Sequence, residues 1–434
     1  MSEDDQVENP GWRRRLASLR LDVTPLRGDR DFRILFAAGT VFYFGFMITY
    51  VALPFQLYHL TGSNFAVGAL GLIELLPLIV CGLYGGALAD HVDRRTMLVL
   101  TGVGQVLLTV GLLGNAMLPH PQVWIIYVLG ALLAAVASLQ RPSREALLPR
   151  VVSHAQLPAA VALSSFGVQL SMLVGPALGG IVIAQVGVPL AFGIDVAGLI
   201  AATALFAGLR RYPVTDGGQP PSVASIVDGI RYAVRRKDLL GTYLVDMVAM
   251  LMASPVVLFP AYASEVLKQP TVLGLLYSAG TVGGLLATAT SGWTSRVHHH
   301  GRAVVLAAAT WGAATAVAAL TNSIWLVLVA FAVAGGADMM SGLFRSVIWN
   351  QTIPDSKRGR LAGIEVLSYS IGPLGGEARA GMMADLTGVR SAILSGGVLC
   401  CVGVGVTALW LRDFWRYDSR TDEHAIAQRE LHTV

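Results

Sequence analysis

Long runs of apolar residues recur along the whole chain, and short polar segments separate them. A helix that crosses a bilayer needs about 20 predominantly apolar residues, and twelve of the runs reach or approach that length. The pattern therefore predicts an all-α integral membrane protein with twelve transmembrane helices. The predicted spans are Arg33–Leu57, Phe65–Leu88, Met97–Leu118, Val123–Leu139, Leu157–Val186, Leu190–Leu209, Leu240–Ala263, Val272–Val297, Ala303–Leu320, Ile324–Ile348, Leu361–Leu386 and Ala392–Leu411.

The basic residues lie almost entirely on one side of these spans. Of the 31 Lys and Arg residues, 28 fall in segments on the N-terminal side, when Arg296 and Arg345 at span ends are assigned to the adjacent loops. Lys268 and Arg390 fall on the other side, and Arg379 falls within a span. Basic residues in short loops mark the cytoplasmic side, so both termini are predicted to be cytoplasmic.

The longest segment between spans divides them into two sets of six. The predicted organisation is a cytoplasmic N-terminal arm over 1–32, a six-helix bundle over 33–209, a cytoplasmic linker over 210–239, a second six-helix bundle over 240–411 and a cytoplasmic tail over 412–434. Within the linker, Val223, Ile226, Ile230 and Val234 recur at helical spacing, which predicts an amphipathic helix on the cytoplasmic face. Transporters that rock one half against the other are organised in this way.

Composition supports a bilayer protein and argues against other classes. The chain is 54% hydrophobic and only 13% charged, whereas soluble domains hold roughly 25% charged residues. The three cysteines, Cys81, Cys400 and Cys401, all fall inside spans, which argues against a disulfide framework or a thiol metal site. The consecutive histidines from His298 to His300 lie in one loop, where neighbours rarely converge on one ion. No metal site is therefore predicted.

The sequence lacks the motifs of ATP-driven pumps and common enzymes. No G-x-x-x-x-G-K-[ST] phosphate loop is present, and no spacing of catalytic groups is recognisable. We therefore expect no enzymatic activity and no cofactor, with a proton gradient as the energy source. The expected partners are a small-molecule substrate and the lipid bilayer, without nucleic acid, and the expected state is a monomer.

Two segments hold small residues at spacings that bring helices close together. In the fifth span Gly175, Pro176, Gly179 and Gly180 form the pattern G-P-x-x-G-G. Glycines four apart let helix backbones approach, and the proline bends the helix. A shorter copy, GPLGG, occupies Gly372–Gly376 in the eleventh span. Ordinary small-residue packing is the alternative explanation for both.

The loop after the second span reads GGALADHVDRR, from Gly85 to Arg95. Small residues before Asp90 let a neighbouring helix approach, and a carboxylate at that place can lie at a helix N-terminus. Arg94 and Arg95 can pair with carboxylates of the loops. The alternative is a basic loop that only marks the cytoplasmic side.

This loop and the twelve-span plan resemble the major facilitator superfamily, in which the same loop reads G-x-x-x-D-R-x-G-R-R. Four residues match the pattern: Gly86, Asp90, Arg94 and Arg95. His91 stands in place of an arginine, and Asp93 in place of a glycine. The resemblance implies a conformational latch, in which Asp90 docks near the start of helix eleven and holds the cytoplasmic side closed. The G-P-x-x-G-G pattern resembles the antiporter motif of the superfamily, which implies export.

A closer resemblance, to the enterobactin (siderophore) exporter branch, extends over most of the chain. It is carried by GALADHVDRR, RPSREALLPRVVSHAQLPAAVALSS, LFPAYASEVL, LGLLYSAGTVGGLLA and PDSKRGRLAGI. Nearby multidrug and macrolide exporters share these segments. The resemblance therefore implies an exporter, and its implication for the substrate is weaker.

Several ionisable residues fall inside the predicted spans: Glu74, Asp195, Asp246, Asp338, Glu365, Glu377 and Arg379. Charges inside a bilayer are costly and usually functional. A buried carboxyl is protonated more readily because desolvation penalises its charged form, so it can carry a proton across. The proton-coupling candidates are Glu74, Asp246, Asp338 and Glu377. The alternative for each is a hydrogen bond to a neighbouring helix or an ion pair with an arginine.

Glu377 and Arg379 are two residues apart and therefore point in different directions round a helix. We expect Glu377 to face the bundle interior and Arg379 to have a structural partner on a neighbouring helix.

In the first span Tyr43, Phe46 and Tyr50 fall on one helical face. Because small-molecule sites are mostly apolar and aromatic, these three are the candidates for the substrate cavity. Packing, or contact with lipid, is the alternative explanation for such a stripe.

Together these patterns predict a secondary active, proton-coupled exporter of the bacterial inner membrane that works by alternating access. The predicted cargo is a siderophore or a similarly bulky amphipathic small molecule. A multidrug or macrolide efflux pump is the alternative within transport. A non-transporting membrane scaffold or sensor is the alternative from another class.

Overall fold

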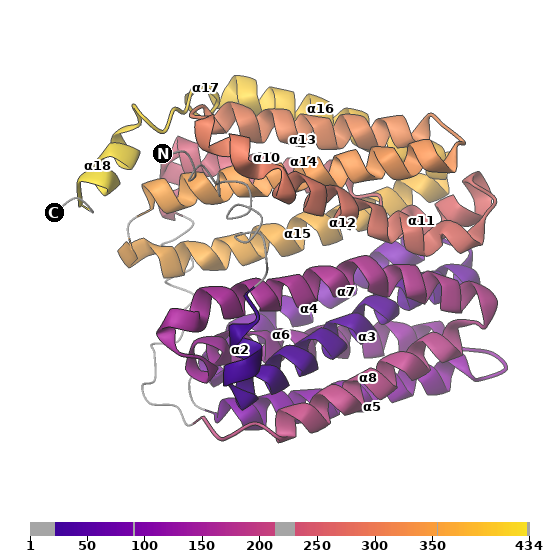
Figure 1. The fold of residues 1–434 in the computed structure, drawn as a ribbon. Coiled ribbons are helices and arrows are strands. Elements are labelled where there is room, and N and C mark those ends of the chain that lie inside the picture. The colour runs from indigo at the N-terminus through magenta and orange to yellow at the C-terminus, as the bar shows by residue number, and fades with distance from the viewer. Residues whose placement is uncertain (1–21, 90–91, 213–230, 354, 432–434) are drawn as a thin grey trace, which may run out of the picture.

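The computed structural model describes residues 22–89, 92–212, 231–353 and 355–431, without the side chains of 83–89, 154, 355–367 and 429–431. The long helices follow the apolar runs of the sequence, as Figure 1 shows. They are α3 (Arg30–Thr61), α4 (Asn64–Ala89), α5 (Arg94–Ala116), α6 (Val123–Val151), α7 (Leu157–Gln185), α8 (Val188–Ala207), α10 (Lys237–Ala253), α12 (Leu273–Ala289), α13 (His300–Ala319), α14 (Ile324–Thr352), α15 (Asp355–Thr387) and α16 (Val389–Trp410). The short helices are α2 (Thr24–Gly28), α11 (Phe259–Ala261), α17 (Arg412–Trp415) and α18 (Glu423–Leu431).

Local signals set the ends of these helices. At the end of α3, Gly62 has a φ of 63°, and its N–H donates to the Tyr58 carbonyl at 2.8 Å. Glycine takes this left-handed conformation at little steric cost, so it is a common helix stop. At the start of α5, the Asp93 side chain accepts a hydrogen bond from the Thr96 N–H at 2.9 Å. This bond satisfies one of the free donors of the first turn.

Two predicted spans are not single α-helices over their whole length. The seventh, Leu240–Ala263, falls within a membrane-length helical segment over Lys237–Val266, but α10 stops early, at Ala253. Ser254, which precedes Pro255, has a ψ of 99°, because a residue before proline is pushed out of the helical region. The chain continues as a 3-10 turn, the short α11 and a π turn over Tyr262–Val266. The eighth span also stops early, since α12 ends at Ala289 and a 3-10 turn follows.

Eleven helical segments in the described part of the chain are long and apolar enough to cross a membrane. The remaining long helix, α15, has 33 residues but carries several charged side chains. It runs alongside the others in Figure 1. Large apolar side chains such as Leu76, Leu107 and Leu409 point outward and are 66 to 71% exposed. Soluble proteins rarely expose such a continuous apolar surface, so a bilayer is the fitting environment.

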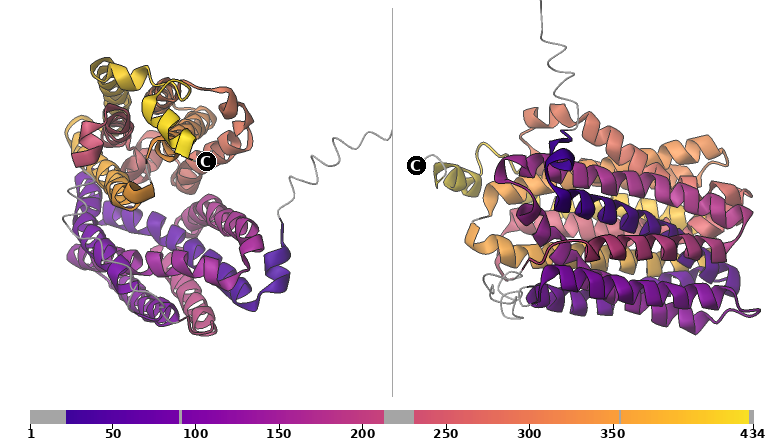
Figure 2. Two further views of the ribbon diagram at one scale, coloured as in Figure 1. Left: turned by 90° about the vertical axis from the view of Figure 1, so that its left-hand side faces the viewer. Right: turned by 60° about the horizontal axis from the view of Figure 1, so that its bottom comes forward.

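The long helices form two groups that repeat one packing plan. Helices α3 to α8 lie in the lower part of Figure 1 and α10 to α16 in the upper part, and the end-on view in Figure 2 separates the same groups. In the first group α3 packs on α7 and α8, and in the second α10 packs on α15 and α16. Between the groups, α4 packs on α15 and α7 packs on α12. By order in their groups, α4 corresponds to α12 and α7 corresponds to α15. The contact between α4 and α15 is therefore equivalent to the contact between α12 and α7, as expected for structural repeats.

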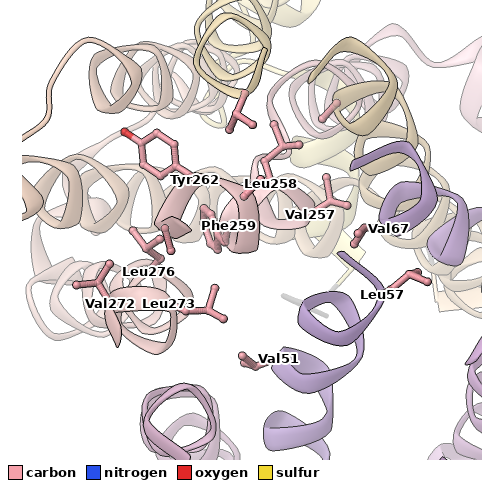
Figure 3. Close-up of a cluster of buried hydrophobic side chains, with 14 of the residues drawn as sticks. Val51, Leu57, Val67, Val257, Leu258, Phe259, Tyr262, Val272, Leu273 and Leu276 are labelled. Carbon is pink, nitrogen blue, oxygen red and sulfur yellow. The ribbon is translucent and has the colours of Figure 1, made fainter. Parts of the chain in front are cut away.

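An apolar cluster joins the two groups at one end of the molecule. We call this the far end, where α3 ends and α4 begins, and we call the opposite end, where α3 begins, the terminal end. At the far end Leu57 and Val67 pack in one buried cluster with Val257, Leu258 and Leu273, as Figure 3 shows. Two other buried clusters lie within one group each. The groups are therefore joined by a shared core at the far end.

Most of the predicted linker helix cannot be compared, because Val223, Ile226 and Ile230 lie outside the described residues. Residues 231–235 are helical, and Val234 is 56% exposed. The predicted divisions at 32/33, 209/210, 239/240 and 411/412 remain predictions.

Candidate functional site: the boundary between the two helix groups

The G-P-x-x-G-G motif of α7 contacts two helices at once. A Cβ on Gly179 would lie 3.3 Å from the Ile48 Cα of α3. A Cβ on Gly180 would lie only 2.5 Å from the backbone nitrogen of Gly274 in α12. Gly175 and Pro176 are also buried. Glycine is therefore needed on one side to hold α7 against its own group and on the other to meet the second group.

The GPLGG copy in α15 packs in the corresponding way. Gly372 and Gly376 face Met250 of α10, as Gly175 and Gly179 face α3. The side of α15 that meets the other group carries Glu377, Gly381 and Asp385, which are four residues apart. Residues at this spacing lie on one helical face.

Glu377 lies at the boundary between the groups. A Cβ on Gly71 of α4 would lie 3.4 Å from its Oε2 atom. Glu74 is on the next turn of α4 but is turned toward α6, where a Cβ on Gly130 would lie 3.0 Å from its Oε1 atom. Glu377 of α15 thus contacts α4 about one turn away from Glu74.

Asp385 receives four hydrogen bonds from the start of α4. Its carboxylate accepts from the Ser63 hydroxyl at 2.6 Å, from the Asn64 N–H at 2.8 Å, from the Asn64 amide at 3.1 Å and from the Phe65 N–H at 3.0 Å. A residue of the second group thus caps the first turn of a helix in the first group. The sequence did not reveal this role, although an acid beside the end of an apolar span was the available signal.

Arg379 points away from this boundary, as its spacing from Glu377 predicted. Its Nε donates to the Leu251 carbonyl at 3.0 Å and its Nη2 to the Met252 carbonyl at 2.5 Å. These carbonyls belong to the last turn of α10, where backbone acceptors lack helical partners. The prediction of a structural partner on a neighbouring helix is confirmed.

A buried ion pair lies inside the second group. Arg345 of α14 is 2.5 Å from the Asp246 Oδ1 atom, and both side chains are at most 3% exposed. The Ser368 hydroxyl of α15 donates to the other carboxylate oxygen at 3.0 Å. Asp338 lies on the same helix as Arg345. The assignment of Arg345 to a loop was wrong, because α14 continues to Thr352 and an arginine paired with a carboxylate can be buried there.

Asp195 of α8 is buried against α3. It accepts a hydrogen bond from the Thr49 hydroxyl at 2.5 Å, and its Oδ1 atom has no partner among the described residues. The sequence indicated a charge within the span but not this contact, because Thr49 is 146 residues away. Glu365 lies among the residues whose side chains are not described.

The aromatic stripe of α3 divides between two environments. Phe42, Phe46 and Tyr50 stack in sequence with ring centroids 6.5 and 6.4 Å apart. The Tyr50 ring meets that of Tyr277 in α12 edge-on at 5.6 Å, so the stripe reaches the second group. Tyr43 instead lines a cavity of about 480 Å³ between α3, α6 and α7. Phe46 and Tyr50 are not part of its lining.

Of the twelve residues that line this cavity, the sequence pointed only to Tyr43 and did not reveal Arg144. It was counted among loop residues, but α6 continues to Val151 and holds it beside α3. Its Nη2 donates to the Tyr43 hydroxyl at 2.6 Å, and its guanidinium lies 4.4 Å from the centroid of the Tyr43 ring.

The loop after α4 is described only in part. Asp90 lies outside the described residues, and the side-chain surroundings of Gly86 are not described. The Arg94 Nη1 donates to the Ala146 carbonyl at 2.7 Å, and the Arg95 Nη2 to the Ala207 carbonyl at 2.5 Å. Both arginines thus join α5 to neighbouring helices of its own group. The latch formed by Gly86, Asp90, Arg94 and Arg95 remains a prediction.

Asp93, which departs from the superfamily pattern, has a capping role. It binds the Thr96 N–H at the start of α5, and its other oxygen accepts the Tyr212 N–H at 3.0 Å. Burial on its own would raise the pKa of Asp93, but these hydrogen bonds lower the pKa below its usual value.

The repeated helix groups, their glycine contacts and their apolar exterior define a membrane transporter of the major facilitator superfamily. The sequence matches the family model described as "Transmembrane secretion effector" over residues 22–431, and the chain belongs to this family. It is a multi-pass protein of the bacterial inner membrane.

Curated relatives and solved structures agree with this assignment. The chain is 28% identical to the enterobactin exporter EntS of Salmonella typhi over 391 residues, which cover 88% of this chain and 93% of the relative. It is also 28% identical to the enterobactin exporter EntS of Escherichia coli O1:K1 / APEC over 397 residues, with 88% and 92% covered.

The fold is similar to that of solved transporters. A crystal structure of the peptide transporter POT matches with a TM-score of 0.72 at 13% identity, covering 89% of this chain and 95% of that one. A bacterial homolog of the human lysosomal transporter Spinster matches with a TM-score of 0.68 at 13% identity, covering 93% and 97%.

Proposed function

We propose that this protein is a secondary active, proton-coupled exporter of a siderophore or a similarly bulky amphipathic small molecule. It works by alternating access, with twelve spans in two six-helix halves and both termini in the cytoplasm. The observation that carries the proposal is the repeated contact between the halves, α7 on α12 and α4 on α15, built on close glycine packing. Two such surfaces can separate and re-form as the halves rock.

The direction and the cargo rest on similarity. The curated relatives are named enterobactin exporters, and the G-P-x-x-G-G segment of α7 lies where the halves meet. If the N-terminal side is cytoplasmic, the far end is the outer side of the membrane. The contacts at that end then hold the outer side closed, and the cavity beside Tyr43 lies toward the cytoplasm.

Proton coupling is supported by the carboxylates at the boundary. Glu377 lies between the halves against α4, and Glu74 lies on the next turn of that helix. Protonation of a buried carboxyl removes a charge that is costly to desolvate. Loss and gain of a proton would therefore change the free energy of packing α15 against α4.

Transport into proteoliposomes tests the proposal. Purified protein is reconstituted, a pH gradient is imposed, and uptake of a catecholate siderophore is compared with uptake of a cationic dye. We expect gradient-dependent movement of the siderophore that a protonophore abolishes. Movement of the dye alone would indicate a drug efflux pump, and movement of neither would contradict proton-driven export. Vesicles without protein, and vesicles with a membrane potential but no pH gradient, are the controls.

A further inference from the structure

The cavity beside Tyr43 lies between the terminal-end portions of three helices of the first group. It is lined by the side chains of Tyr43 on α3, Arg144 and Glu145 on α6, and Ser164, Ser165 and Gln169 on α7. Its volume of about 480 Å³ falls within the usual range of roughly 300 to 1,000 Å³ for small-molecule sites. It is placed away from the far end, where the two groups share their core.

The cavity lining holds one arginine, Arg144, whose charge is not paired with a carboxylate of the described residues. Glu145 is paired with Arg141 on the same helix at 2.8 Å. None of the ion pairs found in the described part of the chain involves Arg144. The Arg144 Nη1 atom is buried and has no hydrogen-bond partner there. A buried guanidinium nitrogen without an acceptor is costly, so an anionic oxygen that reached it would lower the free energy of the site.

Two donors are arranged side by side. The Tyr43 hydroxyl oxygen accepts a hydrogen bond from the Arg144 Nη2, and its own proton therefore remains available for donation. The guanidinium lies 4.4 Å from the Tyr43 ring centroid and 5.5 Å from the Phe42 ring centroid, so aromatic faces hold it in place. The serine hydroxyls and the Gln169 amide add polar groups on the opposite wall. Positioned donors beside aromatic rings suit a flat ring that carries an anionic oxygen.

We propose that this cavity binds an aromatic anion, a carboxylate or catecholate on a ring, that forms part of the exported molecule. Arg144 and Tyr43 bind the anionic oxygens, and Phe36 borders the ring. The positive charge of Arg144 disfavours cations at the same place. This inference rests on the proposed function for the identity of the ligand, but binding can be measured without transport.

The test uses the purified full-length protein and three probes of nearly equal shape: benzoate, benzamide and benzamidinium. Binding is followed by titration calorimetry, and 2,3-dihydroxybenzoate is added as a catechol-bearing anion. We expect benzoate to bind about tenfold more tightly than benzamide, and benzamidinium to bind least, because a hydrogen bond to a charged partner is stronger than a neutral one. Tighter binding of 2,3-dihydroxybenzoate than of benzoate would show that the catechol hydroxyls contribute to recognition, and weaker binding would show that the site prefers a plain ring carboxylate.

Variants locate the effect. Arg144→Gln should lower benzoate affinity about tenfold or more and leave benzamide affinity nearly unchanged. Arg302→Gln, an exposed arginine of α13 outside the cavity, is the matched control and should bind as the parent does. Equal binding of benzoate and benzamide by the parent would overturn the inference even if Arg144→Gln failed to fold. So would unchanged benzoate affinity in a folded Arg144→Gln protein.

Failure of this inference can be separated from failure of the proposed function. Binding of the aromatic anion without any transport would leave the site in place and count against export. Siderophore transport that is unaffected by Arg144→Gln would support export and contradict a role for this cavity in binding the substrate.

Discussion

The Asp385 carboxylate, near the end of α15, accepts the backbone N–H of Asn64, at the start of α4, at 2.8 Å. The two residues are 321 positions apart in the sequence and belong to different helix groups. The second group thereby satisfies donors that the first turn of α4 cannot satisfy within its own helix. If transport separates the groups at the far end, as proposed, these hydrogen bonds must break, so Asp385 stabilises the joined state.

Asp385→Ala should shift the molecule toward a state with a separated far end. Hydrogen bonds to a charged group are worth roughly 1.5 to 3 kcal/mol, so the equilibrium should move by about tenfold or more. Spin labels at Thr61 and Leu386, measured by double electron–electron resonance, report the distance across this end. Arg390→Gln is the control, because Arg390 contacts Asn322 within its own group. Unchanged label distances in Asp385→Ala would contradict the role.

Gly180→Ala should impair transport through a steric effect. The new Cβ would lie 2.5 Å from the Gly274 nitrogen and 2.7 Å from its Cα, and both are backbone atoms that cannot move aside alone. Helices α7 and α12 must therefore separate slightly, and the far end should close less well. Siderophore export and labelling of a cysteine placed at Leu273 measure the two effects.

Gly193→Ala is the matched control for this substitution. Gly193 lies in α8 of the same group, and a Cβ there meets nothing within 4 Å. Replacement of a helical glycine by alanine favours the helix by up to about 1 kcal/mol, so this variant should be at least as stable as the parent. Equal export by the two variants would show that the Gly180 contact is not needed.

Arg345→Gln should strongly destabilise the second helix group. Removal of one partner leaves Asp246 buried without its charge partner, which typically costs about 3 to 5 kcal/mol. The double variant Asp246→Asn with Arg345→Gln should recover part of that loss, because no charge remains buried. Unfolding of the detergent-purified protein measures Arg345→Gln, Asp246→Asn and the double variant. Additive losses in the double variant would argue against a coupled pair.

The helices could be predicted from the sequence because their signals are local. The twelve apolar runs match the positions of the long helices, and Gly62 and Pro255 explain where two of them stop. The break at Ser254 was missed because the run of apolar residues continues past it, and hydropathy does not register backbone geometry. Close approach of helix backbones was predicted only for α7 and α15, because only their glycine spacing indicates it.

The site could be predicted less completely, because its contacts join distant parts of the chain. The sequence singled out Glu377 and Tyr43 from residue type and spacing alone. It could not show that Asp385 caps α4 or that Arg144 meets Tyr43, since those partners lie 321 and 101 residues away. Arg144 was counted in a loop because the apolar run of its helix ends at Leu139, and Arg345 was assigned to one because it lies near a span end. Their partners in the structure explain why both can lie within long helices.

Glu377→Gln should separate substrate movement from proton movement. Glutamine keeps the size of the side chain but cannot take up or release a proton, and its place against Gly71 of α4 lies on the surface where the two groups meet. If protonation of Glu377 couples the gradient to that contact, the variant should lose gradient-driven export by about tenfold or more, whereas a proton-independent exchange of labelled for unlabelled substrate should continue.

Glu74→Gln, one turn along α4, should show a smaller loss of the same kind if the two carboxylates act together. Glu423→Gln, whose exposed carboxylate lies on α18 outside both the boundary and the cavity, should keep the dependence of export on the pH gradient. A Glu377→Gln protein whose export still follows the gradient would show that another group carries the proton.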